Sequence, residues 1–268
     1  MAGPSSDPSP VPLVLDGLTV AYGERLAVDR LSITVRPGEI YGLLGSNGAG
    51  KTSTIKAIVG LLQPVRGELR VFGRDVRTDS LSVKQRIGYV PETSMLYEAL
   101  TPREFLEFVA SVRRMDSATV SRRMQVYAEA FRLGSELEEP IATLSNGTRQ
   151  KVLILAALLH SPPLLVLDEP LNSLDPRSVR IMKDLLLRYV SENGRGVLFS
   201  THTMEVAQQL CGRVGILDRG VLRGEGTLAA LRERVERGDA SLEEVFLRLT
   251  EEDAGVRAAV DALDAPNV

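Results

Sequence analysis

The segment GSNGAGKT, at residues 45–52, constrains the fold of this chain more than any other stretch. It matches the phosphate-loop pattern, with two glycines, a lysine and a threonine at the required spacing. It follows EIYGLL, which is typical of a buried strand, and it opens a helical pattern that begins at Lys51. Because backbone N–H groups at such a strand–loop–helix junction wrap phosphate groups, the segment predicts a phosphate-binding loop in an α/β fold.

Each residue type in this loop has a chemical reason. Glycines let the backbone approach phosphates closely, Lys51 reaches the terminal phosphates, and the Thr52 hydroxyl is placed to bind magnesium. A glycine-rich turn before an ordinary helix is the alternative, but here the full pattern and its context coincide. The candidate nucleotide-binding residues of the loop are Gly45, Ser46, Asn47, Gly48, Ala49, Gly50, Lys51, Thr52 and Ser53.

Strands and helices alternate on both sides of the loop, as α/β folds require. Periodicity and turn residues place their boundaries, and VGILDRG is the last strand expected. The expected elements are strands over 13–22, 31–35 and 39–45, a helix over 51–62, a hairpin over 67–76, strands over 86–92, 164–169, 196–202 and 214–220, and a helix over 175–190.

The periodicity between Thr101 and His160 is helical instead. The first helix there opens with a capping box in which Thr101 is the N-cap and Glu104 reaches back to it. A similar box, formed by Ser241 and Glu244, predicts a helix near the C-terminus. The apolar stripe predicted for the first helix consists of Phe105, Phe108, Val109 and Val112.

Composition excludes several other classes of protein. The net charge of the 268 residues is −3, which argues against a nucleic-acid binder that works through bulk positive charge. Cys211 is the single cysteine, so an internal disulfide and a cysteine-based zinc site are excluded. No apolar run approaches the roughly 18 residues that span a bilayer. Residues 1–12 are rich in proline and serine and predict a disordered leader, and we expect any membrane connection to come through a partner.

Two adjacent carboxylates end the stretch LLVLDE, at residues 164–169. The strand would deliver Asp168 to the carboxyl edge of the sheet, where open α/β folds bind ligands. Asp168 is therefore a candidate magnesium ligand, and Glu169 is placed to polarise an attacking water. A solvated acidic turn is the alternative interpretation.

Two further residues end predicted strands and could be functional or structural. His202 closes VLFSTH, so it would reach the same sheet edge as Asp168. Tyr22 ends a strand and could pack there or stack on an adenine base. His160 has no comparable position, and we interpret it as a helix-end residue.

The segment LSNGTRQK, at residues 144–151, is a short polar segment that opens a long apolar helix. Glycine and asparagine destabilise the interior of a helix, so this polar segment should lie at the N-terminus of the helix, ahead of Val152. A helix N-terminus is a second anion site in a chain that already has a phosphate loop. One nucleotide would not require both.

In order along the chain, GSNGAGKT, GYVPE, LSNGTRQK, LLVLDEP, NSLD and STH resemble the nucleotide-binding domain of ABC transporters. The resemblance covers residues 13–225. It implies a P-loop NTPase (RecA-like) core with a β subdomain, an α-helical subdomain inserted at about 93–160, and a short helical tail over 226–268. The polar segment LSNGTRQK resembles the ABC signature motif.

The resemblance also implies why two anion sites exist. In dimers of this family, the signature of one subunit covers the ATP that the phosphate loop of the other holds. Ser145 and Gly147 would contact the γ-phosphate across the interface, and Asp175 would lie in the loop that joins the two sites. Tyr22 would stack on adenine, and the catalytic residues would be Lys51, the base Glu169 and the γ-phosphate contact His202.

Three residues depart from the pattern of the family. Glu92 stands where glutamine is usual; both offer an oxygen to magnesium, but the carboxylate changes the local charge. Asn146 replaces the commoner second glycine of the signature, and Thr148 stands where glutamine is frequent. The predicted magnesium ligands are therefore Thr52, Glu92 and Asp168.

GYVPE, LYEALTPREFLEFVA and SLEEVFLRLT are similar to ATPases of bacterial drug and antibiotic exporters. The expected function is that of an ATPase that uses ATP and Mg²⁺. It would dimerise head to tail with a second copy or a paralogue and power a separate permease for drug-like or hydrophobic compounds, from the cytoplasmic face of the membrane. The alternatives are an ABC-type ATPase that acts on DNA or ribosomes, although no nucleic-acid partner is expected, and a nucleotide sensor without turnover.

Overall fold

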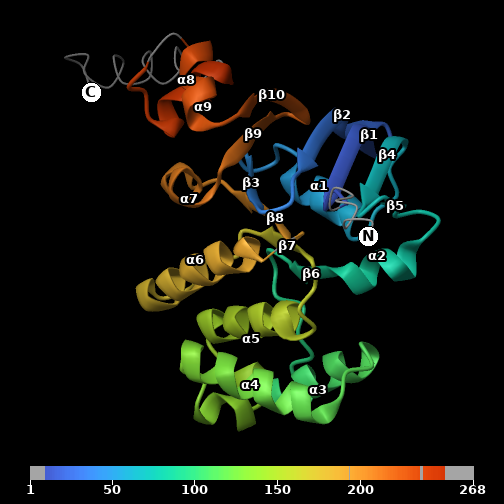
Figure 1. Cartoon of the computed structure of the whole chain (residues 1–268), viewed down its shortest axis with the longest axis vertical. Coiled ribbons are helices and arrows are strands. Elements are labelled where there is room, and N and C mark those ends of the chain that lie inside the picture. Colours follow the sequence, from blue (N-terminus) through green and yellow to red (C-terminus); the bar gives the residue numbers. More distant parts are fainter. Residues whose placement is uncertain (1–9, 193, 236–237, 251–268) are drawn as a thin grey trace, which may run out of the picture.

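The computed structural model describes residues 10–192, 194–235 and 238–250. Within these ranges the chain forms two sheets that share one α/β core (Figure 1). Residues 1–9 of the predicted leader and residues 251–268 of the predicted tail lie outside the described residues. The α/β fold class is as predicted.

The larger sheet has the strand order β10-β9-β3-β8-β7-β6. Its neighbours pair in parallel except β9 and β10, which form an antiparallel hairpin. β7 and β8 are buried along their whole length, as expected for strands covered on both faces. The strands are β3 Glu39–Leu44, β6 Ile87–Val90, β7 Leu164–Asp168, β8 Gly196–Thr201, β9 Arg213–Asp218 and β10 Val221–Gly226.

The smaller sheet is antiparallel, with the order β2-β1-β4-β5. Alternating apolar residues of β1 and β2 pack into one core cluster with β3 and the first helix, which fixes the smaller sheet beside the phosphate loop. This sheet corresponds to the predicted β subdomain. Its strands are β1 Leu13–Tyr22, β2 Arg25–Val35, β4 Arg66–Val71 and β5 Arg74–Asp75.

Helices fill the predicted helical region between β6 and β7. Figure 1 shows α5 next to the central sheet, with α3 and α4 as an outer layer. A core cluster from α4, α5, β7 and α6 joins these helices to the sheet. The elements are α3 Pro102–Val112, α4 Ser117–Phe131, η1 Ser135–Glu138, η2 Ile141–Thr143 and α5 Asn146–Leu159.

The apolar stripe predicted for α3 is partly wrong. Its capping box is present, and Phe105 is buried as expected. Phe108 and Val112 are 48% and 66% exposed, however, while Leu106 lies in the core. The helix is rotated so that part of its predicted inner face points outward.

The remaining helices are α1 Lys51–Ile58, α2 Ser80–Arg86, α6 Pro176–Ser191, α7 Met204–Leu210, α8 Leu228–Arg234 and α9 Leu242–Leu249. α9 begins with the predicted capping box of Ser241 and Glu244. α1 ends at Ile58 and not at Leu62. The sequence reasoning missed α2, α7 and α8, and the expectation that 214–220 is the last strand was wrong, since β10 follows it.

Candidate active site

A cleft of about 550 Å³ lies where the phosphate loop meets the smaller sheet. The loop needs glycine at two tight approaches. A Cβ on Gly45 would lie 2.5 Å from the Leu217 carbonyl oxygen, and one on Gly50 would lie 2.5 Å from that of Ala27. The lining comprises Tyr22, Arg25, Leu26, Ala27, Ser46, Asn47, Gly48, Ala49, Gly50, Lys51, Thr52, Ser53, Glu92, Glu169 and Arg219.

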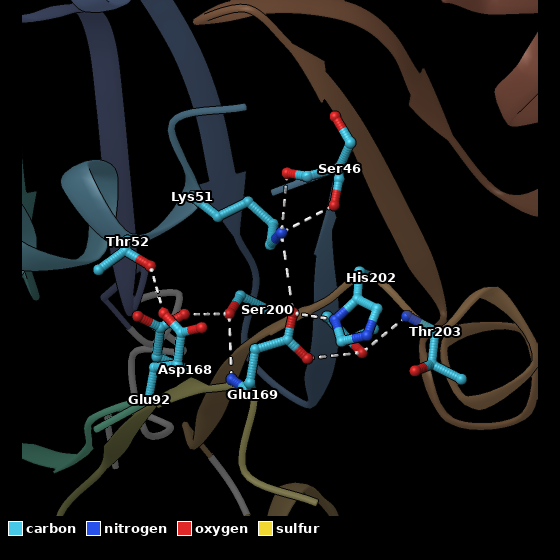
Figure 2. Close-up of polar contacts among 11 residues, drawn as sticks. Ser46, Lys51, Thr52, Glu92, Asp168, Glu169, Ser200, His202 and Thr203 are labelled. Carbon is cyan, nitrogen blue, oxygen red and sulfur yellow. Dashed lines mark hydrogen bonds and ion pairs between the residues drawn. The ribbon is translucent and has the colours of Figure 1, made fainter. Parts of the chain in front are cut away.

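Lys51 is nearly buried at the base of this cleft. Its Nζ donates hydrogen bonds to the carbonyl oxygens of Gly45 at 2.7 Å and Ser46 at 3.2 Å, and lies 3.7 Å from Glu169 Oε1. Figure 2 shows the ammonium group between the loop and the end of β7. A phosphate on the loop would therefore meet a cation that is already in place.

Asp168 ends β7 and is fully buried. Ser200 Oγ donates a hydrogen bond to its Oδ1 at 2.5 Å, whereas its Oδ2 is buried with no hydrogen-bond partner among the described residues. Burial raises the pKa of this carboxyl above its ordinary value. A buried, unpartnered carboxylate oxygen of this kind fits a cation ligand.

The other two predicted magnesium ligands lie beside Asp168. Thr52 Oγ1 donates a hydrogen bond to Glu92 Oε2 at 3.2 Å, and Figure 2 places both next to the Asp168 carboxylate. A hydroxyl and two carboxylates are the hard oxygen ligands that Mg²⁺ prefers. Since no group of three or more His, Cys, Asp or Glu side chains among the described residues could hold a metal ion, phosphate oxygens would have to complete the shell.

Glu169 follows Asp168 with a left-handed backbone, φ 48°. Such a conformation is costly for a residue other than glycine. Its carboxylate is 4% exposed and is held from two sides: Oε2 accepts a hydrogen bond from Thr201 Oγ1 at 3.1 Å, and Oε1 lies 2.8 Å from His202 Nδ1. The surrounding contacts thus fix the carboxylate towards Lys51, in position to orient a water.

Tyr22 lies at the outer end of the cleft and is 50% exposed. Its hydroxyl lies 3.4 Å from Ser53 Oγ, so the tip of the ring reaches the first turn of α1. The exposed ring can stack on a base whose phosphates lie on the loop. His202 and Asp168 do not line the cleft themselves: His202 contacts the lining residue Glu169, and Asp168 is hydrogen-bonded to Ser200 behind it.

The predicted signature residues lie away from the cleft. Ser145 is the N-cap of α5, and its Oγ accepts a hydrogen bond from the Thr148 N–H at 3.2 Å. Gly147 lies in the first turn, where a Cβ would lie 2.6 Å from the Ser173 carbonyl oxygen. The two anion-binding helix N-termini of the chain thus do not meet within one molecule.

Asp175 is also outside the cleft and caps α6 through the Ser178 N–H at 2.9 Å. Lys151 of α5 pairs with it at 2.8 Å, and this contact, followed by the bonds from Ser178, lowers the pKa of Asp175 below its usual range. Gln150 Nε2 donates to the Pro170 carbonyl oxygen at 3.0 Å. The start of α5 is therefore tied to the segment that follows Glu169.

Sequence reasoning missed Ser200, Lys151, Arg25 and Arg219. Ser200 could have been predicted, because it lies in the STH segment and is paired in register with Asp168 across β7 and β8. Lys151 carries no local signal of its contact with Asp175. Arg25 and Arg219 reach the cleft from different sheets, which only the tertiary fold brings together.

A phosphate loop at the carboxyl edge of a parallel sheet, with Asp168 and Glu169 beside it, defines a P-loop ATPase. Known proteins agree with this. The sequence profile of the family described as ABC transporter matches residues 28–172. The chain belongs to the ABC transporter family, as an ATP-binding subunit that hydrolyses ATP.

Individual relatives cover most of the chain. The ABC-type transporter ATP-binding protein EcsA of Bacillus subtilis is 36% identical, over 91% of this chain and 98% of its own. The linearmycin resistance ATP-binding protein LnrL of Bacillus subtilis is 34% identical, over 83% and 71%. A solved ATP-binding subunit of an ABC transporter superposes with a TM-score of 0.85 at 34% identity, over 89% and 99%.

A second solved structure is the dimeric bacterial ABC transporter cassette MJ0796, with a TM-score of 0.74 at 25% identity over 81% and 98% of the two chains. Its ADP- and phosphate-bound form is a post-hydrolysis state. In the part of this chain that the structure describes, no helix is both long and apolar enough to cross a bilayer.

Proposed function

We propose that this chain is the Mg²⁺-dependent ATPase of an exporter for drug-like or other hydrophobic compounds. It acts as a head-to-tail dimer, with a second copy or a paralogue, beneath a separate membrane permease on the cytoplasmic face. The observation that carries the proposal is the cleft that joins Tyr22, the phosphate loop, Glu92 and Glu169. The name of the relative LnrL, a resistance protein, supports the direction and the class of compound.

In the proposed chemistry, water attacks the γ-phosphate of ATP. Glu169 orients and polarises this water, while His202 and Thr201 hold the Glu169 carboxylate. Lys51 meets the β- and γ-phosphates. A bound Mg²⁺ would neutralise charge that develops on the phosphates, and Thr52, Glu92 and Asp168 would hold it.

The position of the signature supports a dimer. Ser145 and Gly147 stand at a helix N-terminus on a surface other than the cleft, so each can serve only a nucleotide bound to another chain. The relative MJ0796 is dimeric. We infer the same arrangement here, with a nucleotide-binding unit over 13–225, an inserted helical subdomain at about 93–160 and a helical tail from 226.

An exposed apolar surface near Glu92 supports a permease partner. Met95, Tyr97, Phe108 and Val112 are 76%, 60%, 48% and 66% exposed. Tyr97 and Phe108 contact each other edge to face, with ring centroids 5.7 Å apart. Exposed apolar side chains that contact each other, as Tyr97 and Phe108 do, are typical of an interaction site. The proposed occupant is a cytoplasmic helix of the permease.

Co-expression with a candidate permease, a membrane protein encoded next to this chain, tests the proposal. We expect the wild-type chain in the membrane fraction only when that permease is present. Phe108→Glu should release it, because a charge would enter an apolar contact. The matched control is Leu187→Glu, on α6, where the side chain is 49% exposed. Wild-type chain absent from membranes despite the permease would contradict the proposal.

A further inference from the structure

The β9–β10 hairpin reaches the cleft from the far end of the chain. Its two-residue turn is Arg219–Gly220, between the paired residues Asp218 and Val221. Both turn residues have positive φ, 47° and 81°, as in the type I′ turns that suit hairpins. Asparagine is favoured at the first of these positions. An arginine there has a strained backbone, which suggests that its side chain has a function.

The turn is fastened to the phosphate loop. The Gly220 N–H donates to the Ala49 carbonyl oxygen at 2.8 Å, and the Asp29 N–H of β2 donates to the Gly220 carbonyl oxygen at 2.8 Å. A Cβ on Gly220 would lie 2.8 Å from the Ala27 carbonyl oxygen. The backbone of Arg219 is therefore held at a fixed place beside the loop.

The Arg219 side chain lines the cleft and is 85% exposed. Its ion pair with Asp218 is weak, with Nε 3.9 Å from Oδ1. Asp218 is already engaged by Arg223, whose Nη2 lies 3.1 Å from Oδ2. Most of the charge of Arg219 thus remains available to a ligand.

The position in the cleft selects which part of a nucleotide this charge meets. The loop cradles the α- and β-phosphates, Lys51 and Thr52 mark the γ-phosphate and metal end, and Tyr22 marks the base end. The turn bonds to Ala49, beside β2, whose residues Arg25 to Ala27 form the wall next to Tyr22. The guanidinium would therefore lie near the α-phosphate of a nucleotide held on the loop.

We propose that Arg219 is a nucleotide-binding residue that supplies positive charge to the α-phosphate of a bound nucleoside di- or triphosphate. Arg25, which is paired with Tyr22 across the β1–β2 hairpin, lines the same wall and adds to the positive potential there. The inference rests on the proposed placement of the nucleotide in this cleft. It adds a contact that does not depend on the γ-phosphate and that ADP keeps after hydrolysis.

Titration calorimetry with ADP and ATP on Arg219→Asn tests the inference. Asparagine suits the left-handed turn, so the melting temperature should not fall, and loss of binding is then not loss of folding. We expect about a three- to tenfold weaker affinity for both nucleotides, by the same factor, at low salt. The loss should shrink as salt rises, and Arg219→Lys should recover part of it.

The matched control is Arg114→Asn, an exposed arginine at φ 54° that lines no part of the cleft. It should bind both nucleotides like the wild type. A loss for ATP alone would place the charge at the γ-phosphate and overturn the inference. So would a salt-independent loss without rescue by lysine, which would indicate stacking on the base.

Lys51→Ala separates this inference from the proposed function. If Lys51→Ala weakens binding of ATP and Arg219→Asn leaves both affinities unchanged, the cleft holds the nucleotide and the inference about Arg219 is wrong. If Lys51→Ala leaves ATP affinity unchanged, the nucleotide does not lie on the loop, and both proposals fail.

Discussion

His202 Nδ1 lies 2.8 Å from Glu169 Oε1. Each residue comes just past the end of a strand, Glu169 after β7 and His202 after β8, and these strands are parallel neighbours. The contact therefore follows from strand register, and it places an imidazole that is 49% exposed against a carboxylate that is 4% exposed. Whatever moves His202 also changes the surroundings of the proposed catalytic base.

Glu169→Gln should keep ATP binding and lose hydrolysis by about a hundredfold or more, because an amide does not polarise water as a carboxylate does. With ATP and magnesium the variant should accumulate as a dimer. Phosphate release and size-exclusion chromatography check these outcomes. Glu68→Gln, on the exposed side of β4, is the control. A monomer with full turnover would remove Glu169 from its assigned role.

His202→Ala should slow hydrolysis by about tenfold to a hundredfold while ATP affinity stays nearly constant, since the imidazole holds the Glu169 carboxylate from the exposed side. The rates of Glu169→Gln and of the double variant should be almost equal, because both changes disable one unit. Steady-state rates of the four proteins provide the cycle. Multiplicative effects would mean that the two residues act independently.

Mixing two inactive variants should restore some hydrolysis. Lys51→Ala disables the phosphate loop, and Ser145→Asp keeps a good N-cap on α5 while it sets a negative charge against a phosphate. Their heterodimer has one site with both defects and one with neither. Phosphate release from the mixture is the measurement. If the mixture is no more active than its parts, a Ser145→Cys to Ser46→Cys crosslink would show whether the signature meets a partner or both sites must act together.

Glu92→Ala should lower transport more than it lowers ATP binding. The Glu92 carboxylate accepts a hydrogen bond from Thr52 beside the proposed magnesium site. In the sequence, Glu92 comes shortly before Tyr97, which belongs to the exposed apolar surface. Efflux with the co-expressed permease and equilibrium nucleotide binding are the two readouts. Glu92→Gln, with the residue usual in the family, should transport. Normal transport by the alanine variant would refute this coupling route.

Two carboxyls should give pH dependences of opposite sign. Burial raises the folded-state pKa of Asp168, so folding stability falls as pH rises from its unfolded pKa to its folded pKa, and Asp168→Asn removes that fall. The pKa of Asp175 is lowered by Lys151, so its stabilisation is present above the unfolded pKa and is lost as pH falls through the folded pKa. Thermal unfolding from acidic to neutral pH, without nucleotide, should show Asp168→Asn gaining and Asp175→Asn losing stability relative to the wild type towards neutral pH. Parallel curves for both variants would contradict the assignment.

Local patterns explain which parts of the fold could be predicted. The phosphate loop, the end of β7 and the helix caps at Thr101 and Asp175 carry strong short-range signals, and the structure has each in place. The face of α3 could not be chosen this way, since Phe108 and Leu106 both fit an apolar stripe at helical spacing. α2 buries only Val83 and thus shows no period.

The contacts that complete the site are long-range. Lys151 meets Asp175 across two helices, and Arg219 enters the cleft from a hairpin more distant still in sequence. Sequence spacing does not predict such contacts, because the loops between the two residues can vary in length while the contact stays the same. The fold alone brings them together.

The close approach of Gly147 to the Ser173 carbonyl oxygen has a consequence for engineering. Together with the Gln150–Pro170 hydrogen bond, it packs the first turn of α5 closely against the segment 170–175, so the two segments depend on each other's shape. A chimaera that grafts the signature of a relative onto this chain without the matching 170–175 segment would join two surfaces shaped for other partners. The exchangeable module of this ATPase is therefore discontinuous in sequence, and recombination that keeps both pieces together should yield working hybrids.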